Sequence, residues 1–484
     1  MPERKTIQGY LATVEEQIRW KRARPVVARE LERHLEDQRD AFAAEGKPPE
    51  EAERLAVEEM GDPVAVGTEL DRIHRPRPSW DIFLPVLLSL AVWLGFRVFQ
   101  HSDFSSFTGY YLPLWGRILF LAVGAMTLLY FLDYTILDRA PMLVVGLVTA
   151  AGFVRFFTNL AVDGLRCWTG DYLPLLLPLA MALSIYALRN RGTRGLAACC
   201  GLGLLQAVPW MVQGWVQWLW PSLLCGTALL ALAVKSGWFG GKKRNWLLVL
   251  AYALVMLGAI LTARVILMGG TPHSLLDAIS RAQGGEDDYV MWRKQYIQDI
   301  VFNSRLVGMA DIPDTWKNLA DWQEYMRDLL TYAEYDDMLL AILGNFGWLA
   351  FGAVQAPVVV MLAAGWRKCR HQTAVLGRLL ASAILLTLTW QAAAYVVQTL
   401  LGLLGSYALL TPFPYPLVSD GGTALVIDCA LLGLLLSVFR NGSVVREDSR
   451  GRACIPRRDR FAIHWQNSQN DEKILTVSLI LKRR

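Results

Sequence analysis

Apolar stretches of the length that crosses a bilayer are the feature that most constrains how this chain folds. Ten of them follow residue 80, at roughly 82–99, 112–131, 141–158, 172–188, 195–212, 218–234, 246–267, 338–363, 376–402 and 423–440. A bilayer core requires about 17–25 predominantly apolar residues in a helix. Hydrophobic residues make up 54% of the 484 residues. The sequence therefore predicts an all-α polytopic membrane protein with about ten transmembrane helices, preceded by a small soluble helical domain.

Residues 1–80 are the predicted soluble domain. Apolar residues recur at helical spacing in 7–20, 26–42 and 50–60, and charged residues occupy the other faces. The run Met60-Gly61-Asp62-Pro63 predicts the end of one helix and the start of the next. Glycine suits the position after a helix, aspartate can cap the following helix, and proline fits its first turn. The predicted membrane domain spans 81–440, and 441–484 form a basic tail.

The distribution of positive charge predicts the orientation. An even number of spans places both termini on one side, together with the loops Arg189–Arg194, Lys235–Arg244 and Arg367–Arg378. These loops are rich in Lys and Arg, which favour the cytoplasmic side. We therefore expect both termini to be cytoplasmic and the long loop 268–337 to face outward.

The predicted outer loop, 268–337, differs in charge from the loops of the other side. It holds 13 Asp and Glu against 6 Lys and Arg. Its periodic pieces, Tyr289–Phe302 and Thr315–Tyr332, predict amphipathic helices at the membrane interface. Long loops that carry structure of their own are often functional, so we expect the site in or near this loop.

Several function classes are disfavoured by composition. A net charge of +5 does not indicate nucleic-acid binding, and the seven cysteines show no metal-ligand spacing with histidine. A transporter would place ionisable groups in the middle of its spans, whereas here they gather at the span ends. Arg155 and Arg264 are expected to extend toward the interface. The tail contains an apolar, strand-like run at Ile474–Leu481.

Five segments carry, in order, a resemblance to one membrane family. They are Phe131–Arg139 (similar to I-D-Y-x-x-L-x-R), Asp163–Trp168 (N-G-A-R-R-W), Trp220–Leu229 (Q-P-D-x-G-T-A-L), Asp337–Gly344 (D-F-I-F-A-I-I-G) and Pro416–Thr423 (P-F-V-S-Y-G-G-S). On these motifs residues 82–440 resemble a divergent member of the SEDS family, the FtsW/RodA/SpoVE group of cell-wall glycosyltransferases. Residues 1–80 resemble the permease-prefix module found ahead of various bacterial membrane proteins.

The resemblance implies a peptidoglycan glycosyltransferase that polymerises lipid II at the outer face of the bacterial cytoplasmic membrane. The C4 hydroxyl of an acceptor sugar attacks the anomeric carbon of a donor, and undecaprenyl diphosphate leaves with inversion. By family position Asp337 is the general base. The leaving diphosphate needs positive charge or a divalent cation such as Mg²⁺. Membrane lipids and a class B penicillin-binding protein are the implied partners, and nucleic acid is not.

Other residues are candidates for substrate binding. Arg166 is suited to bidentate phosphate contact, and Trp168 suits either stacking on a sugar or anchoring at the headgroups. Asp336 can raise the pKa of Asp337 or share a metal with it, or both carboxylates can simply cap the following helix. Further candidates are Gln298, one residue out of register with the family's Y-Q-x-x-Q, and the turn residues Ser419, Gly421 and Gly422.

Departures from the family motifs leave an alternative open. Asp171-Tyr172-Leu173-Pro174 stands where the family has Q-P-S-E, and Ser222 stands near the position of the aspartate in the P-D motif. These changes favour a non-catalytic SEDS-like scaffold or a lipid II-binding protein in cell division, shape or sporulation.

Overall fold

The computed structural model of the chain describes residues 6–20, 23–74, 78–100, 112–161, 172–212, 219–241, 243–267, 288–313, 318–324, 338–403, 414–418, 422–441, 461–467 and 473–479. The chain divides into two compact units, Met1–Val445 and Arg446–Arg484. The first contains the four-helix N-terminal domain and the membrane domain.

The N-terminal domain consists of α1 (Ile7–Gln17), α2 (Arg24–Ala44), α3 (Pro49–Met60) and α4 (Pro63–His74). Helix α1 packs on α2 and α4, and α2 packs on α3. The predicted boundary between α3 and α4 is confirmed. Gly61 has a φ of 84°, the N–H of Ala65 donates to Asp62 Oδ2 at 3.1 Å, and Pro63 opens α4.

Eight helices of the membrane domain are long and apolar enough to cross a bilayer in the part of the chain that is described. They are α5 (Trp80–Gln100), α7 (Leu112–Phe131), α9 (Pro141–Ala161), α11 (Gly192–Val212), α13 (Lys243–Leu267), α18 (Trp348–Arg370), α19 (Val375–Leu403) and α20 (Gly422–Asn441). Two shorter apolar helices, η4–α10 (Leu173–Leu176 and Leu177–Leu188) and α12 (Leu219–Lys235), complete the set. The prediction of an all-α, multi-pass membrane domain with about ten spans is confirmed.

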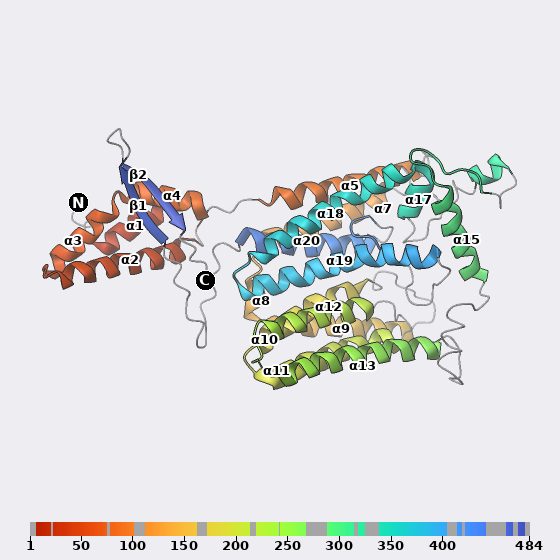
Figure 1. The fold of residues 1–484 in the computed structure, drawn as a ribbon, viewed down its shortest axis with the longest axis horizontal. Coiled ribbons are helices and arrows are strands. Elements are labelled where there is room, and N and C mark those ends of the chain that lie inside the picture. The colour runs from red at the N-terminus through yellow and green to blue at the C-terminus, as the bar shows by residue number, and fades with distance from the viewer. Residues whose placement is uncertain are drawn as a thin grey trace. The chain divides into compact units, whose positions relative to one another are not determined.

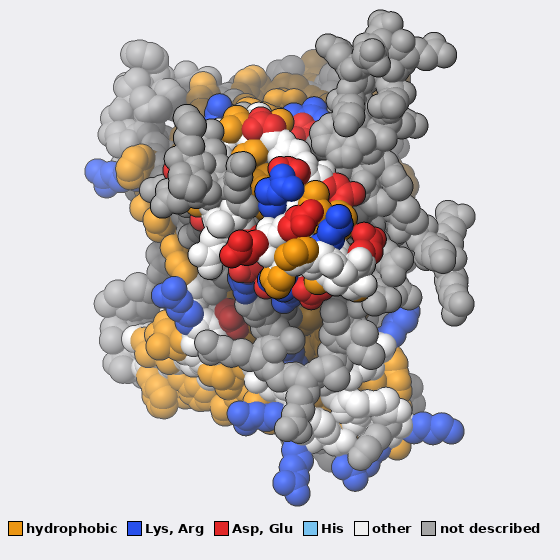
Figure 2. All heavy atoms as spheres, turned by 90° about the vertical axis from the view of Figure 1, so that its left-hand side faces the viewer, with side chains coloured by type: hydrophobic (Ala, Val, Ile, Leu, Met, Phe, Trp, Pro, Cys, Tyr) orange, Lys and Arg blue, Asp and Glu red, His pale blue; other side chains and the backbone are white. Residues whose placement is uncertain are grey.

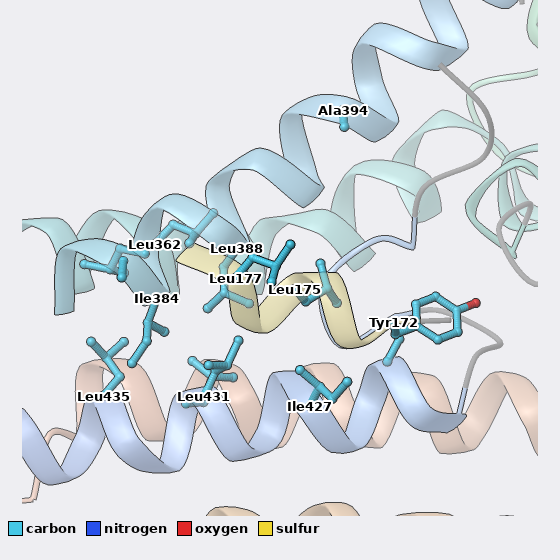
Figure 3. Close-up of a cluster of buried hydrophobic side chains, with 14 of the residues drawn as sticks. Tyr172, Leu175, Leu177, Leu362, Ile384, Leu388, Ala394, Ile427, Leu431 and Leu435 are labelled. Atoms are coloured by element: carbon cyan, nitrogen blue, oxygen red, sulfur yellow. The ribbon is translucent and has the colours of Figure 1, made fainter. Parts of the chain in front are cut away.

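Helix α10 lies at the centre of this domain. It packs on α9, α11, α12 and α19, and α20 packs on α7 and α19 (Figure 1). Leu175 and Leu177 meet side chains of α19 and α20, among them Leu388 and Leu431 (Figure 3). In the apolar windows of α7 and α9 17% of residues are buried, against 72% in α20. The peripheral helices therefore present their apolar side chains to lipid, and α10 and α20 form the protein core.

We call the end where α5 begins and α20 ends the tail end, and the opposite end the loop end. The connections 189–191, 236–241 and 371–374 lie at the tail end, where Figure 2 shows Lys and Arg side chains at the margins of the apolar surface. The short helix α8 (Ile136–Arg139) lies there too. At this end Ser437 Oγ donates to the carbonyl oxygen of Leu132 at 2.6 Å. The arrangement agrees with the predicted orientation, which remains a prediction.

The predicted eighth span is wrong in one respect. Residues 338–363 were expected to form one continuous helix, but α17 (Met338–Phe346) ends before α18 begins at Trp348. Helix α18 alone has spanning length, at 23 residues. Helix α17 is instead a separate, nine-residue helix that packs on α18 and on α15 (Asp288–Asn303). Helix α15 confirms the first predicted helix of the long loop, and 319–324 are also helical.

The second unit contains a hairpin of two antiparallel strands, β1 (Phe461–Asn467) and β2 (Lys473–Leu479). Ala462 pairs with Ser478, and Trp465 pairs with Leu475. The strand-like run predicted in the tail is therefore confirmed as β2, and this hairpin is the exception to the helical fold among the described residues.

Candidate functional site

The break between α17 and α18 is the first irregular feature of the loop end. Gly347 joins the two helices with a φ of 85°. A Cβ atom at this position would lie 2.6 Å from the carbonyl oxygen of Arg305. Glycine is the residue that combines a positive φ with so close an approach of backbone. The break between α17 and α18 therefore requires glycine at position 347.

The segment Asn303–Asp311, which starts at the last residue of α15, accepts the first hydrogen bonds of α18. We call it the bracing loop. The N–H of Trp348 donates to the carbonyl oxygen of Arg305 at 3.0 Å, and that of Leu349 donates to Leu306 at 3.1 Å. The first N–H groups of a helix have no partner within the helix. The bracing loop supplies partners for two of those of α18.

The same loop also donates to the last turn of α17. The N–H of Gly308 donates to the carbonyl oxygen of Phe346 at 3.1 Å, and that of Ala310 donates to Gly344 at 2.8 Å. Carbonyl groups at a helix end likewise lack partners within the helix. The bracing loop thus holds both sides of the break through backbone groups.

Contacts within the long loop hold the bracing loop in shape. The N–H of Asp311 donates to Asn303 O at 2.8 Å, and Arg305 Nε donates to Asp311 Oδ1 at 2.6 Å. The hydrogen bonds from Arg305 hold the pKa of the Asp311 carboxyl below its usual value. The fully buried Trp322 donates from Nε1 to Ala310 O at 3.3 Å.

Helix α17 is buried along almost its whole length. Met338 to Gly344 are all buried. Asp337, the predicted base, directly precedes Met338 in the sequence, but Asp336 and Asp337 lie outside the described residues. The N-terminal end of a helix favours negative charge. This property suits both interpretations of the two carboxylates, as a catalytic pair or as helix caps.

Most other predicted site residues also lie outside the described part. These are Arg166, Trp168, Ser419 and Gly421. Gln298 is half-buried on α15, which packs on α17 and α19. Gly422 is the first residue of α20, where a Cβ would lie 2.7 Å from Ile118 Cδ1 of α7. Helix α19 contacts both α15, which carries Gln298, and α20, which begins at Gly422. It is therefore the helix that lies next to both candidates.

The segment Pro414–Val418, between α19 and α20, is the second irregular feature of the loop end. All five of its residues are buried, and Leu417 has a φ of 62°. The N–H of Leu417 donates to Asp428 Oδ2 at 3.2 Å, and Gln391 Nε2 of α19 donates to Asp428 Oδ1 at 3.1 Å. Asp428 and Gln391 are both fully buried.

Sequence reasoning missed Asp428. The expectation that ionisable groups gather at span ends is wrong here, because Asp428 lies seven residues into the 20-residue helix α20. A single carboxylate inside an apolar run was itself the available signal, since buried charge in a span is costly and usually functional.

A buried cation near the loop end was also missed. Arg97 of α5 is 3% exposed, and its guanidinium carbon lies 5.8 Å from the ring centre of Trp93 and 5.7 Å from that of Trp115. Arg155 of α9 is buried as well, so the expectation that it extends to the interface is wrong. The Arg264 side chain lies outside the described residues. A buried guanidinium such as that of Arg97 is suited to pairing with an anionic group.

Metal binding gains no support from the residues that are described. They contain no group of three or more His, Cys, Asp and Glu side chains placed to hold an ion. The divalent cation suggested above concerns Asp336 and Asp337, which are not among them.

Comparison with known proteins identifies the fold. No protein-family model and no curated protein matches the chain. A chain from the structure described as "Structural coordination of polymerization and crosslinking by a peptidoglycan synthase complex" matches with a TM-score of 0.51 and 19% identity. The match covers 75% of this chain and 98% of the other. The two proteins share a fold. This agreement supports the resemblance to the SEDS family that the ordered motifs show.

A second match is the rod shape determining protein RodA of Thermus thermophilus, in the form of an Asp-to-Ala variant. It has 18% identity and a TM-score of 0.37, and it covers 75% of this chain and 98% of RodA. At this TM-score the match adds no further argument.

Proposed function

We propose that this protein is a SEDS-type peptidoglycan glycosyltransferase, which polymerises lipid II at the outer face of the bacterial cytoplasmic membrane. The observation that carries the proposal is the shared fold with a chain of a peptidoglycan synthase complex, over 98% of that chain. The five ordered motifs fall within the same membrane domain.

In the proposed reaction Asp337 accepts the proton of the acceptor hydroxyl as the bond to the anomeric carbon forms. The diphosphate leaves with its own negative charge, so one base and nearby positive charge suffice. Arg166 is the proposed phosphate ligand. Arg97 offers a further cation, which is buried on α5; Phe99 of the same helix contacts Phe346 of α17 with ring centres 5.1 Å apart.

The sugar and the partner are assigned on the same basis. Trp168, Gln298, Ser419, Gly421 and Gly422 are proposed to bind the glycan chain, and Asp336 to tune Asp337. A class B penicillin-binding protein is the proposed partner, because the matching chain belongs to a complex that couples polymerization with crosslinking.

The test is polymerisation of labelled lipid II by the purified chain together with its candidate penicillin-binding partner. Removal of a general base lowers rates by about 10²–10⁴-fold, so Asp337→Ala should leave almost no glycan product. Asp311→Ala, which removes an exposed carboxylate of the bracing loop, is the matched control and should retain the wild-type rate.

The alternative, a scaffold or lipid II-binding protein, is favoured by Asp171-Tyr172-Leu173-Pro174 at the family's Q-P-S-E position. Tyr172 is buried and Leu173 opens η4, so this segment serves the helical core. If neither the wild type nor Asp337→Ala made glycan while an active relative did, the scaffold interpretation would replace that of an enzyme. Equal product from wild type and Asp337→Ala would instead remove Asp337 from the mechanism.

A further inference from the structure

The segment Pro414–Val418 is buried within the membrane domain. Asp428 lies six residues beyond Gly422, which corresponds to about 9 Å along a helix axis. Leu417 nevertheless donates to the carboxylate of Asp428. Leu417 therefore lies beside α20, close to Asp428, although it precedes the first residue of that helix in the sequence.

Non-helical backbone at this depth needs partners from protein. In a bilayer such backbone is tolerated where it is buried in protein or lines a cavity, because lipid offers no hydrogen bonds. Leu417 is fully buried with a positive φ, a conformation that costs energy for a branched side chain and persists where its surroundings enforce it. Asp428 helps to enforce this conformation, because its carboxylate, on the following helix α20, accepts the hydrogen bond of the Leu417 N–H.

Gln391 fixes the carboxylate in turn. It donates to the second oxygen of Asp428, so each oxygen has one donor from a different part of the fold. Its own Oε1 is buried without a hydrogen-bond partner in the described structure. That atom could accept a hydrogen bond if residue 428 carried an amide. The three elements α19, α20 and Pro414–Val418 are thus joined at one carboxylate.

We propose that Asp428 is a positioning residue, which with Gln391 holds the segment Pro414–Val418, directly before the proposed substrate-binding residues Ser419, Gly421 and Gly422 in the sequence. The proposal rests on the proposed function only in that these residues bind the lipid-linked sugar. The holding of the segment by Asp428 stands apart from any activity, and it is tested separately.

Thiol labelling tests the holding of the segment. Val418 is 1% exposed, so Val418→Cys should react slowly with a membrane-impermeant maleimide when Cys167 and Cys454 are replaced by serine. Adding Asp428→Leu removes an acceptor of two hydrogen bonds and should raise this rate about tenfold or more. Native Cys225, which is 3% exposed on α12, reports whether the rest of the fold stays closed.

Two further variants separate positioning from general loosening. In Asp428→Asn the amide oxygen can accept from Leu417 while its nitrogen donates to a turned Gln391, so labelling should stay within about threefold of the parent. Gln206→Leu is the matched control, because Gln206 is also buried and donates to Thr149 Oγ1 at 3.0 Å between α11 and α9. Its labelling should not change.

The outcomes decide the proposal in either direction. The proposal is overturned if Val418→Cys is labelled at the same rate with Asp428→Leu as with Gln206→Leu. It is also overturned if Asp428→Asn and Asp428→Leu raise that labelling rate equally. If Asp428→Leu also exposes Cys225 or does not fold, Gln391→Leu replaces it and should raise labelling at residue 418 alone. No rise with that variant either would overturn the proposal.

Polymerisation of lipid II then links the segment to the site. Asp428→Leu should lower kcat/KM about tenfold, mainly through KM, and Asp428→Asn should restore it. If Asp428→Leu alters the labelling of Val418→Cys but the wild-type protein makes no glycan, the positioning role of Asp428 stands and the proposed function is wrong. Altered labelling with unchanged kcat/KM in an active enzyme would overturn the link to the substrate site.

Discussion

The two irregular segments of the loop end are stabilised in different ways. At Gly347 the broken helix is held by backbone groups of the bracing loop, through Trp348, Leu349, Gly308 and Ala310. At Leu417 the backbone is held by a side chain, the carboxylate of Asp428. Backbone pairing depends little on which side chains are present, whereas a side-chain clamp depends on one residue. The first segment should therefore be sensitive to backbone changes and the second to a single substitution.

The largest expected effect is that of Gly347→Ala. The new Cβ would meet the carbonyl oxygen of Arg305 at 2.6 Å in a backbone with positive φ. Strain and overpacking together should lower the free energy of unfolding by about 2–4 kcal/mol. The measurement is thermal unfolding of the purified protein in one detergent. Gly352→Ala in α18, whose Cβ would meet nothing within 4 Å, is the control and should be neutral or slightly stabilising. Equal stability of both variants would show that the break does not depend on glycine.

A smaller effect is expected for Ala310→Pro. Proline lacks the N–H that donates to Gly344 O, and an unpaired buried carbonyl costs about 1–3 kcal/mol. The same unfolding measurement applies. Ala310→Gly keeps the N–H and should cost less than about 1 kcal/mol. If glycine were as harmful as proline, side-chain packing rather than backbone pairing would hold the break.

The smallest effect concerns the exposed pair of Arg305 and Asp311. The pKa of Asp311 is lowered by hydrogen bonding from Arg305, so the folded state favours the carboxylate. The contribution of this carboxylate to the stability of the folded state is therefore complete above the pKa of the unfolded state, about 4, and is lost as the pH falls through the lower pKa of the folded state. The difference in Tm between wild type and Asp311→Asn should be steady near neutral pH and shrink in acid. A difference that stayed the same in acid would mean that ionisation of Asp311 plays no part.

Local signals were sufficient to predict some boundaries. Gly61, Asp62 and Pro63 act within a few residues of one another, and the structure confirms the helix end and start that they predict. The apolar stretches likewise predicted the spans, because bilayer thickness sets their length.

Features that depend on distant partners could not be predicted in this way. Gly347 sits within an apolar run that reads as one helix, and its role depends on Arg305, which lies 42 positions earlier (347 − 305). Asp428 was hidden by the average hydropathy of its span, and its partner Gln391 comes from another helix. Of the candidate site, the structure describes Gln298 and Gly422, whereas the roles of Asp337, Arg166 and Trp168 rest on the resemblance.

The burial of α10 also bears on how the chain enters the membrane during synthesis. Ten of its twelve residues are buried, and its neighbours include α19, which is made almost 190 residues later (375 − 188 = 187). Until α19 emerges from the ribosome, one side of α10 has only lipid, or an insertion factor, to cover it. With its 3-10 turn the segment is also short for a span, so α9 and α11 should help to retain it. Biogenesis of this protein is therefore expected to include a half-assembled stage, in which α9 to α13 await the C-terminal helices.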